Sequence, residues 1–163
     1  MPPLVVLDRI SKAFKGGVMA VFDLSFTVEE GEVLGFIGPN GAGKSTTRKI
    51  LSTILKPTGG QASVAGFSVA REPEKVRRLI GYMPDVCGLY EEMLVADYLR
   101  FFASVYGIKR AAADRAVVDV LALTGLESKA GGLCGALSRG MSRRLHLARV
   151  LLHDPKLLLL DEP

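Results

Sequence analysis

Residues 33–46 read VLGFIGPNGAGKST, an apolar run followed by a glycine-rich loop. The apolar run, residues 33–37, predicts a buried strand. The residues after it match the pattern G-x-x-x-x-G-K-[ST], and a helix over about residues 44–54 is expected next. A strand, a loop of this kind and a helix in this order predict an α/β fold with a phosphate-binding loop.

The loop has the chemistry of a polyphosphate site. Three glycines let successive backbone N–H groups turn inward as an anion-sized nest, and the unpaired N–H groups at the start of the next helix favour negative charge. The nucleotide-binding residues predicted here are Gly38, Asn40, Gly41, Ala42, Gly43, Lys44, Ser45 and Thr46. A glycine-rich turn that precedes a lysine by chance is the alternative, and the flanking strand and helix disfavour it.

Three side chains of the loop have distinct expected roles. Lys44 adds a mobile positive charge for the terminal phosphates, and Thr46 can reach an inner phosphate. Ser45 offers a hydroxyl to Mg²⁺, a hard cation that prefers oxygen ligands and arrives with the nucleotide. The sequence therefore predicts a site for ATP or GTP together with Mg²⁺.

The whole chain is compatible with one domain. It has 163 residues, is 48% hydrophobic and carries a formal charge of +4 from dispersed basic residues, which fits phosphate binding without requiring nucleic acid. No apolar run approaches the roughly 18 residues needed to cross a bilayer, so a cytoplasmic protein is expected. Cys87 and Cys134 have no C-x-x-C spacing, which predicts reduced structural thiols and no zinc site.

Periodicity divides the chain into a strand-rich and a helical part. Alternation from Phe22 to Val28 predicts an antiparallel strand paired with residues 4–14, and short strands are expected at residues 61–65 and 81–83. Helices are expected from Val95 onward and over residues 111–123, the second ending at Gly125. The first of these helices concentrates four aromatic residues, for which core packing is preferred over a partner groove: Tyr98, Phe101, Phe102 and Tyr106.

An acidic pair follows the last apolar run. Residues 157–160 predict a buried parallel strand, which delivers Asp161 and Glu162 to its carboxyl end, where ligands of α/β sheets bind. Asp161 is placed to hold Mg²⁺ through its water shell, and Glu162 to orient or deprotonate a water that attacks the γ-phosphate. Two ordinary surface acids are the alternative.

Ser138 is a favourable N-cap for a helix over residues 139–152. A free helix N-terminus is a second anion site, and we expect it to reach the nucleotide of another subunit. His146, Arg149 and His153 fall on another stripe of this helix, for which a solvated basic face is preferred over a catalytic role.

Together these motifs resemble the ATP-binding cassette (ABC) ATPases of transporters over nearly the whole chain. The resemblance rests on the phosphate loop, on Tyr82-Met83-Pro84-Asp85, on the signature-like LSRGM at residues 137–141 and on the final Asp161-Glu162-Pro163. It implies two modules that sandwich two ATP molecules, with Ser138 and Gly140 contacting the nucleotide of the other module. It also implies that Phe14 stacks on adenine, although a buried strand residue is an alternative there.

Three departures from the family pattern stand out. Asp85 occupies the usual glutamine position and remains a candidate Mg²⁺ ligand, with different coupling expected. Arg139 and Met141 replace residues of the usual LSGGQ signature, and LSRGM-type signatures are familiar from exporter ATPases. The chain also stops at Pro163, ahead of the family's later motifs, so we expect a fragment of a longer protein.

The resemblance therefore implies a P-loop NTPase core with an antiparallel β subdomain and an inserted helical subdomain, incomplete at the C-terminus. The expected division is residues 1–86, strand-rich, residues 87–137, helical, and residues 138–163, the signature helix and acidic strand. The expected function is the Mg²⁺-dependent ATPase subunit of an ABC exporter, paired with a second module and a membrane permease at the inner face of the membrane. The alternatives are a nucleotide-binding module without turnover and, less favoured, a cassette acting on DNA or ribosomes.

Overall fold

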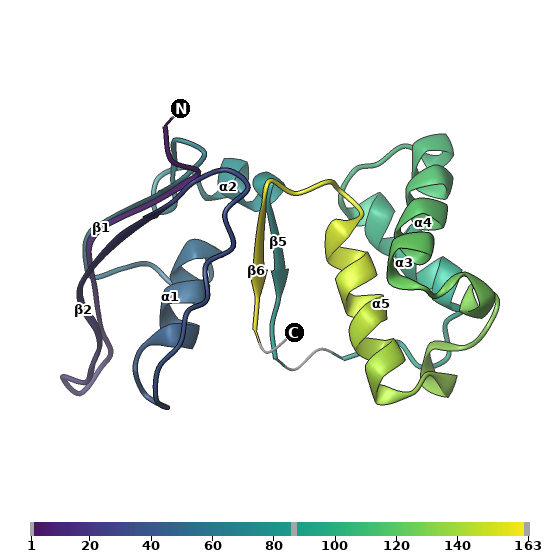
Figure 1. Ribbon diagram of the computed structural model, residues 1–163, viewed down its shortest axis with the longest axis horizontal. Helices are drawn as coiled ribbons and strands as arrows, with labels where there is room; N and C mark the ends of the chain where they lie inside the picture. The colour runs from purple at the N-terminus through teal and green to yellow at the C-terminus, as the bar shows by residue number, and fades with distance from the viewer. Residues whose placement is uncertain (1, 86–87, 162–163) are drawn as a thin grey trace. The chain divides into compact units, whose positions relative to one another are not determined.

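A computed structural model of the protein describes residues 2–85 and 88–161. The chain divides into two compact units, Met1–Ile80 and Gly81–Pro163. Strands and two short helices form the first unit, and three longer helices with a pair of strands form the second (Figure 1). Within the described ranges, no helix combines the length and the apolar character that crossing a membrane requires.

The first unit is built on a four-stranded antiparallel sheet. Its strands are β1 (Val5–Ala13), β2 (Met19–Val28), β3 (Gly59–Val64) and β4 (Phe67–Ser68), in the order β2-β1-β3-β4. Every second residue at the start of β1 is buried, as expected of a strand with one core face. The predicted antiparallel pairing of residues 4–14 with the next strand is confirmed.

The alternation predicted for β2 is wrong at Phe22, whose side chain is 76% exposed. Ile10 pairs with Leu24 and Lys12 pairs with Val21, so β2 carries one extra residue over this stretch. Asp23, which lies within this stretch, has a left-handed backbone with a φ of 49°. Because a bulge of one residue exchanges the two faces of a strand, Val21 is buried in place of Phe22.

Two helices complete the first unit. α1 (Lys44–Leu51) contacts β2 and β3 and buries Thr47, Ile50 and Leu51. It ends three residues before the predicted limit of residue 54. α2 (Pro73–Leu79) contacts β4 and buries Val76.

The predicted buried strand at residues 33–37 is not formed. No strand is assigned to this described segment, and the side chains of Val33 and Ile37 are 96% and 94% exposed. Phe36 of this segment is half-buried, and its ring lies 5.9 Å from that of Phe26 on β2. An apolar run becomes a strand only when neighbouring strands accept its backbone hydrogen bonds, and none of the described strands pairs with this one.

The second unit has a helical core. Its helices are α3 (Val95–Val105), α4 (Arg110–Thr124) and α5 (Arg139–Leu151), with short 3-10 turns η1 (Glu127–Lys129) and η2 (Cys134–Ala136). Tyr98, Leu99 and Leu145 are fully buried where the three helices meet. Gly125 follows the last residue of α4 with a left-handed φ of 63°, so the predicted end of this helix is confirmed.

Two predictions about side-chain burial in the second unit are wrong in part, one for the aromatic residues of α3 and its end, the other for α5. Core packing holds for Tyr98 and partly for Phe102, but Phe101 and Tyr106 are 44% and 39% exposed. The solvated basic face predicted for α5 is wrong at His146, which is only 5% exposed.

Both sides of α5 are covered within the second unit, which explains the buried histidine. One side contacts α3 and α4. On another side, a Cβ built at Gly81 would lie 2.9 Å from the Val150 carbonyl oxygen, so the backbone of the neighbouring strand touches this helix. The half-buried His153 ring stacks on Tyr106 at 4.1 Å between centroids.

The two strands of the second unit are β5 (Ile80–Met83) and β6 (Leu157–Leu160), and they form a separate sheet. They run in the same direction (Figure 1). The N–H of Asp161 donates to the Met83 carbonyl over 2.9 Å, which extends the pairing to the end of β6. The parallel strand predicted at residues 157–160 is therefore confirmed, with Asp161 at its carboxyl end. Its predicted burial is wrong for most of the strand, because only Leu159 is buried and Leu158 is 40% exposed.

Candidate nucleotide-binding site

Gly43 fixes the phosphate loop against the first sheet. Its φ is 82°, in the left-handed region that favours glycine. A Cβ at this position would lie 2.5 Å from the Ala20 carbonyl oxygen and 2.9 Å from Val21 Cγ2. Because real Cβ atoms do not approach backbone oxygen this closely, only glycine fits, and the loop is held against β2 immediately before α1 begins.

The N-terminus of α1 is open to an anion. No side chain caps this helix, and no acidic residue lies in its first turn, which consists entirely of described residues. The first N–H groups of a helix have no partner within the helix, and its dipole gives this end a partial positive charge. The start of α1 therefore presents donors and positive potential in one place, as a phosphate requires.

Lys44 closes the loop on itself. Its Nζ donates to the carbonyl oxygens of Gly38 and Pro39, the second over 2.8 Å, and the residue is half-buried. An ammonium group carries three donors, so phosphate oxygens can replace these neutral carbonyls with charged acceptors. The Lys44 ammonium is therefore held beside the first residues of the loop, Gly38 and Pro39, before any phosphate binds.

Ser45 contacts a residue outside the phosphate-loop pattern. Its Oγ accepts a hydrogen bond from Nη2 of Arg48 over 3.0 Å, one turn further along α1. The i,i+3 spacing of the two residues was the available signal, because such residues lie on the same helix face. Ser45 is exposed and its hydroxyl oxygen has a second lone pair, so it fits a metal ion that brings its remaining oxygen ligands from a nucleotide.

Phe14 lies just beyond β1 and is 43% exposed, so the buried-strand alternative is wrong. The ammonium of Lys12 lies 5.4 Å from the centroid of the Phe14 ring, within the range of a cation–π contact. The exposed ring is available for stacking, and its contact with adenine stays a prediction.

The acidic strand end belongs to the second unit. Asp161 is 8% exposed at the end of β6, which rules out the alternative of an ordinary surface acid for this residue. Glu162, the predicted catalytic carboxylate, lies outside the described residues. Lys44 and Asp161 belong to different compact units, so their convergence on one nucleotide stays a prediction.

The predicted cap of α5 is confirmed. The Ser138 hydroxyl accepts a hydrogen bond from the Met141 N–H over 3.4 Å. Gly140 is exposed, and a Cβ there would meet no described atom within 4 Å. The start of α5 is therefore accessible, and the contact of Ser138 and Gly140 with a partner's nucleotide stays a prediction.

Asp85 lies beside the signature helix. Its carboxylate is 3.8 Å from Nη2 of Arg143 on α5, and its side chain is 54% exposed. Among residues 2–85 and 88–161, no three His, Cys, Asp or Glu side chains gather as a metal site. A Mg²⁺ contact of Asp85 would therefore depend on oxygen ligands from the nucleotide, and it stays a prediction.

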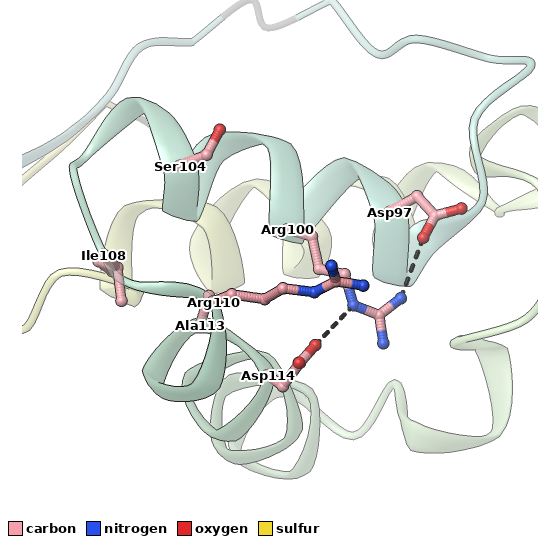
Figure 2. A pocket seen from close by; sticks show the side chains of 7 residues that line it. All are labelled: Asp97, Arg100, Ser104, Ile108, Arg110, Ala113 and Asp114. Atoms are coloured by element: carbon pink, nitrogen blue, oxygen red, sulfur yellow. Dashed lines mark hydrogen bonds and ion pairs between the residues drawn. The ribbon is translucent and has the colours of Figure 1, made fainter.

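A cleft of about 620 Å³ lies between α3 and α4 of the second unit, apart from every predicted site residue (Figure 2). Arg100 bridges the two helices there, donating to Asp114 over 2.9 Å and to Asp97 over 3.0 Å. Its charge is already matched by two carboxylates. The arrangement therefore holds α3 to α4, and with Arg110 in the same lining the two arginines and two aspartates of the cleft carry no net charge.

Comparison with known proteins identifies the family. The family model described as ABC transporter matches residues 21–163, and the chain belongs to the ABC transporter family. Its fold, a P-loop ATPase core with an antiparallel β part and a helical part, is that of ABC ATPase subunits.

Three similar proteins illustrate the relationship. The chain is 40% identical over 98% of its length to the probable multidrug ABC transporter ATP-binding protein YbhF of Escherichia coli. It is 40% identical over 96% of its length to the Nod factor export ATP-binding protein I of a Rhizobium species. The solved structure of cbiO1 from Clostridium perfringens, part of the ABC transporter complex cbiONQ, superposes with a TM-score of 0.88 at 28% identity over the whole chain.

These relatives are longer than the chain. It spans 28% of YbhF, 51% of the Nod factor export protein and 66% of cbiO1. The activity, substrate and partners of a whole transporter ATPase are therefore matters of proposal for this chain.

Proposed function

We propose that the chain binds Mg²⁺-ATP at the phosphate loop and hydrolyses ATP as the ATPase module of an ABC exporter. The observation that carries this proposal is the position of Gly43, whose missing side chain lets the loop sit against β2 with the open end of α1 behind it. Such a loop supplies donors to a phosphate without obstruction. Family membership supports ATP as the nucleotide.

Three residues bind different parts of Mg²⁺-ATP in this proposal: Lys44 the phosphates, Ser45 the metal and Phe14 the base. Lys44 exchanges the carbonyls of Gly38 and Pro39 for oxygens of the terminal phosphates. Ser45 turns its hydroxyl oxygen to the metal, and Phe14 stacks on the base. When bound, Mg²⁺ neutralises charge between the β- and γ-phosphates.

In this proposal the acidic pair, Asp161 and Glu162, carries out the hydrolysis of ATP. Asp161 holds the metal through its water shell, and its burial at the end of β6 fixes the carboxylate in place. Glu162 orients the attacking water and accepts its proton as the new bond to phosphorus forms. Asp85 adds a further oxygen on the metal side, next to Arg143 of the signature helix.

The open end of α5 supports a second module in the proposal. Ser138 and Gly140 would face the nucleotide held by the phosphate loop of that module, since one chain has a single phosphate loop. The names of the relatives, multidrug transport and Nod factor export, support an exporter. A membrane permease would then be the partner that anchors both modules at the membrane.

The test is phosphate release from Mg²⁺-ATP by the purified chain over a range of protein concentrations. Turnover per chain should rise with concentration, because a second module completes each site, and it should vanish in Glu162→Gln. Glu127→Gln, an exposed acid in η1, is the matched control and should retain turnover. Binding of ATP without any turnover would refute the hydrolytic part and leave a nucleotide-binding module.

A further inference from the structure

The side chain of Arg48 is directed at the phosphate end of the candidate site. Its Nη2 donates to Ser45 Oγ over 3.0 Å, and Ser45 is the residue assigned to the metal. The guanidinium is held at its base, because Arg48 is half-buried and its Nε is shielded from solvent. A fixed positive charge therefore lies beside the hydroxyl that a nucleotide-bound Mg²⁺ would contact.

Lys49, the next residue on α1, provides a comparison. It carries the same charge and also lies in the last turn of α1, but it is exposed. The helix places consecutive residues about 100° apart, so the two cations point in different directions. Only Arg48 reaches the hydroxyl of Ser45.

We propose that Arg48 sets the metal dependence of nucleotide binding by acting as a second cation at the phosphate end. This inference rests on the proposed function, since it assumes that the loop binds ATP. A guanidinium carries donors in a planar fork that matches phosphate oxygens, so it stabilises the nucleotide even without metal. The guanidinium also occupies one lone pair of Ser45 Oγ and repels a dication. It therefore reduces the gain in ATP affinity that Mg²⁺ provides.

The proposal predicts an unusual pattern of affinities. In the wild type, ATP should bind measurably in EDTA, and saturating Mg²⁺ should improve the affinity only modestly. Removing the guanidinium should weaken metal-free binding and change binding with Mg²⁺ little, because the metal then gains full access to Ser45. The ratio of the two dissociation constants is therefore the quantity to measure.

The experiment compares wild type, Arg48→Met, Arg48→Lys and Lys49→Met by calorimetric titration with ATP, once in EDTA and once in saturating MgCl₂. In Arg48→Met the ratio of Kd in EDTA to Kd in Mg²⁺ should rise about tenfold, the lower end of what a hydrogen bond to a charged group contributes. Lys49→Met should leave the ratio at the wild-type value. Arg48→Lys, which keeps the charge and loses the fork, should give an intermediate ratio.

The outcomes separate the two proposals. An equal ratio in wild type and Arg48→Met, with circular dichroism showing both folded, would overturn the role of Arg48 while leaving ATP binding intact. If Arg48→Met does not fold, Arg48→Gln, which also removes the charge, is measured in its place, and a wild-type ratio in Arg48→Gln would overturn the role of Arg48. Absence of ATP binding by the wild type under both conditions would overturn the proposed function and this inference with it.

Discussion

Replacing Gly43 with alanine perturbs the loop where the structure leaves no room. The new Cβ would lie 2.5 Å from the Ala20 carbonyl oxygen and 2.9 Å from Val21 Cγ2, at a φ of 82°. Either the loop must lift from β2 or the strand must move. Both responses displace the start of α1, so we expect lost stability together with weaker ATP binding.

The size of the effect follows from two contributions. A left-handed backbone costs an alanine about 1–2 kcal/mol. Forcing an extra methyl group into a filled space adds about 1–3 kcal/mol. The free energy of unfolding should therefore fall by about 2–5 kcal/mol. Gly41 is the matched control, because its φ is 85° but a Cβ there meets no described atom within 4 Å.

Urea unfolding followed by circular dichroism measures both variants. Gly41→Ala should lose only the backbone contribution, about 1–2 kcal/mol, so Gly43→Ala should be the less stable by about 1–3 kcal/mol. Equal losses in the two variants would refute the reasoning, because contact with β2 would then contribute nothing. Calorimetric titration with ATP should show the larger loss of affinity in Gly43→Ala.

Three further predictions concern the second unit. Ser138→Ala removes the cap of α5 and should lower the free energy of unfolding by about 1 kcal/mol in urea titrations, whereas Ser142→Ala inside the helix should cost nothing. Arg100→Met breaks two half-exposed ion pairs, one to Asp97 within α3 and one to Asp114 of α4. The free energy of unfolding should fall by about 0.5–1 kcal/mol at low salt and by less in 0.5 M NaCl, with Arg115→Met, exposed on α4 and outside the cleft lining, as the control. Burial raises the pKa of the Cys134 thiol above its usual 9.0, so the unfolded chain loses this proton at lower pH than the folded one. Stability should therefore be constant below pH 9 with respect to this group and decline as the pH rises above it; a Cys134→Ala variant with the same alkaline decline in urea titrations from pH 7 to 10 would contradict this.

Local signals in the sequence predicted local structure correctly. Gly125 ends α4 and Ser138 caps α5 because each choice depends on the backbone within a few residues. The pairing of β1 with β2 also followed from alternation and chain proximity. The glycine pattern of the phosphate loop is also a local signal, because glycine adopts the left-handed backbone conformation of such turns without steric cost.

Properties that depend on distant neighbours were not predictable. Residues 33–37 have the composition of a buried strand, but a strand needs partners that a local pattern does not reveal. His146 has the spacing of an exposed stripe, yet the helix is covered on more than one side. Phe22 changed faces because of one extra residue in β2.

The sequence pattern predicted the phosphate-loop residues of the candidate site but not the cation of Arg48. Lys44 and Ser45 follow from the loop pattern, and the structure places both at the open end of α1. Arg48 was overlooked because the pattern ends before it, although the i,i+3 spacing places it beside Ser45.

The most direct test of the central claim is ATP binding by the wild type and by Lys44→Ala, measured by calorimetric titration in Mg²⁺. We expect one ATP per chain in the wild type and an affinity at least about tenfold weaker in Lys44→Ala, because a charge-assisted contact with phosphate is lost. Lys49→Ala should bind as the wild type does. Equal affinity of Lys44→Ala and wild type would contradict the assignment of residues 38–46 as the nucleotide site.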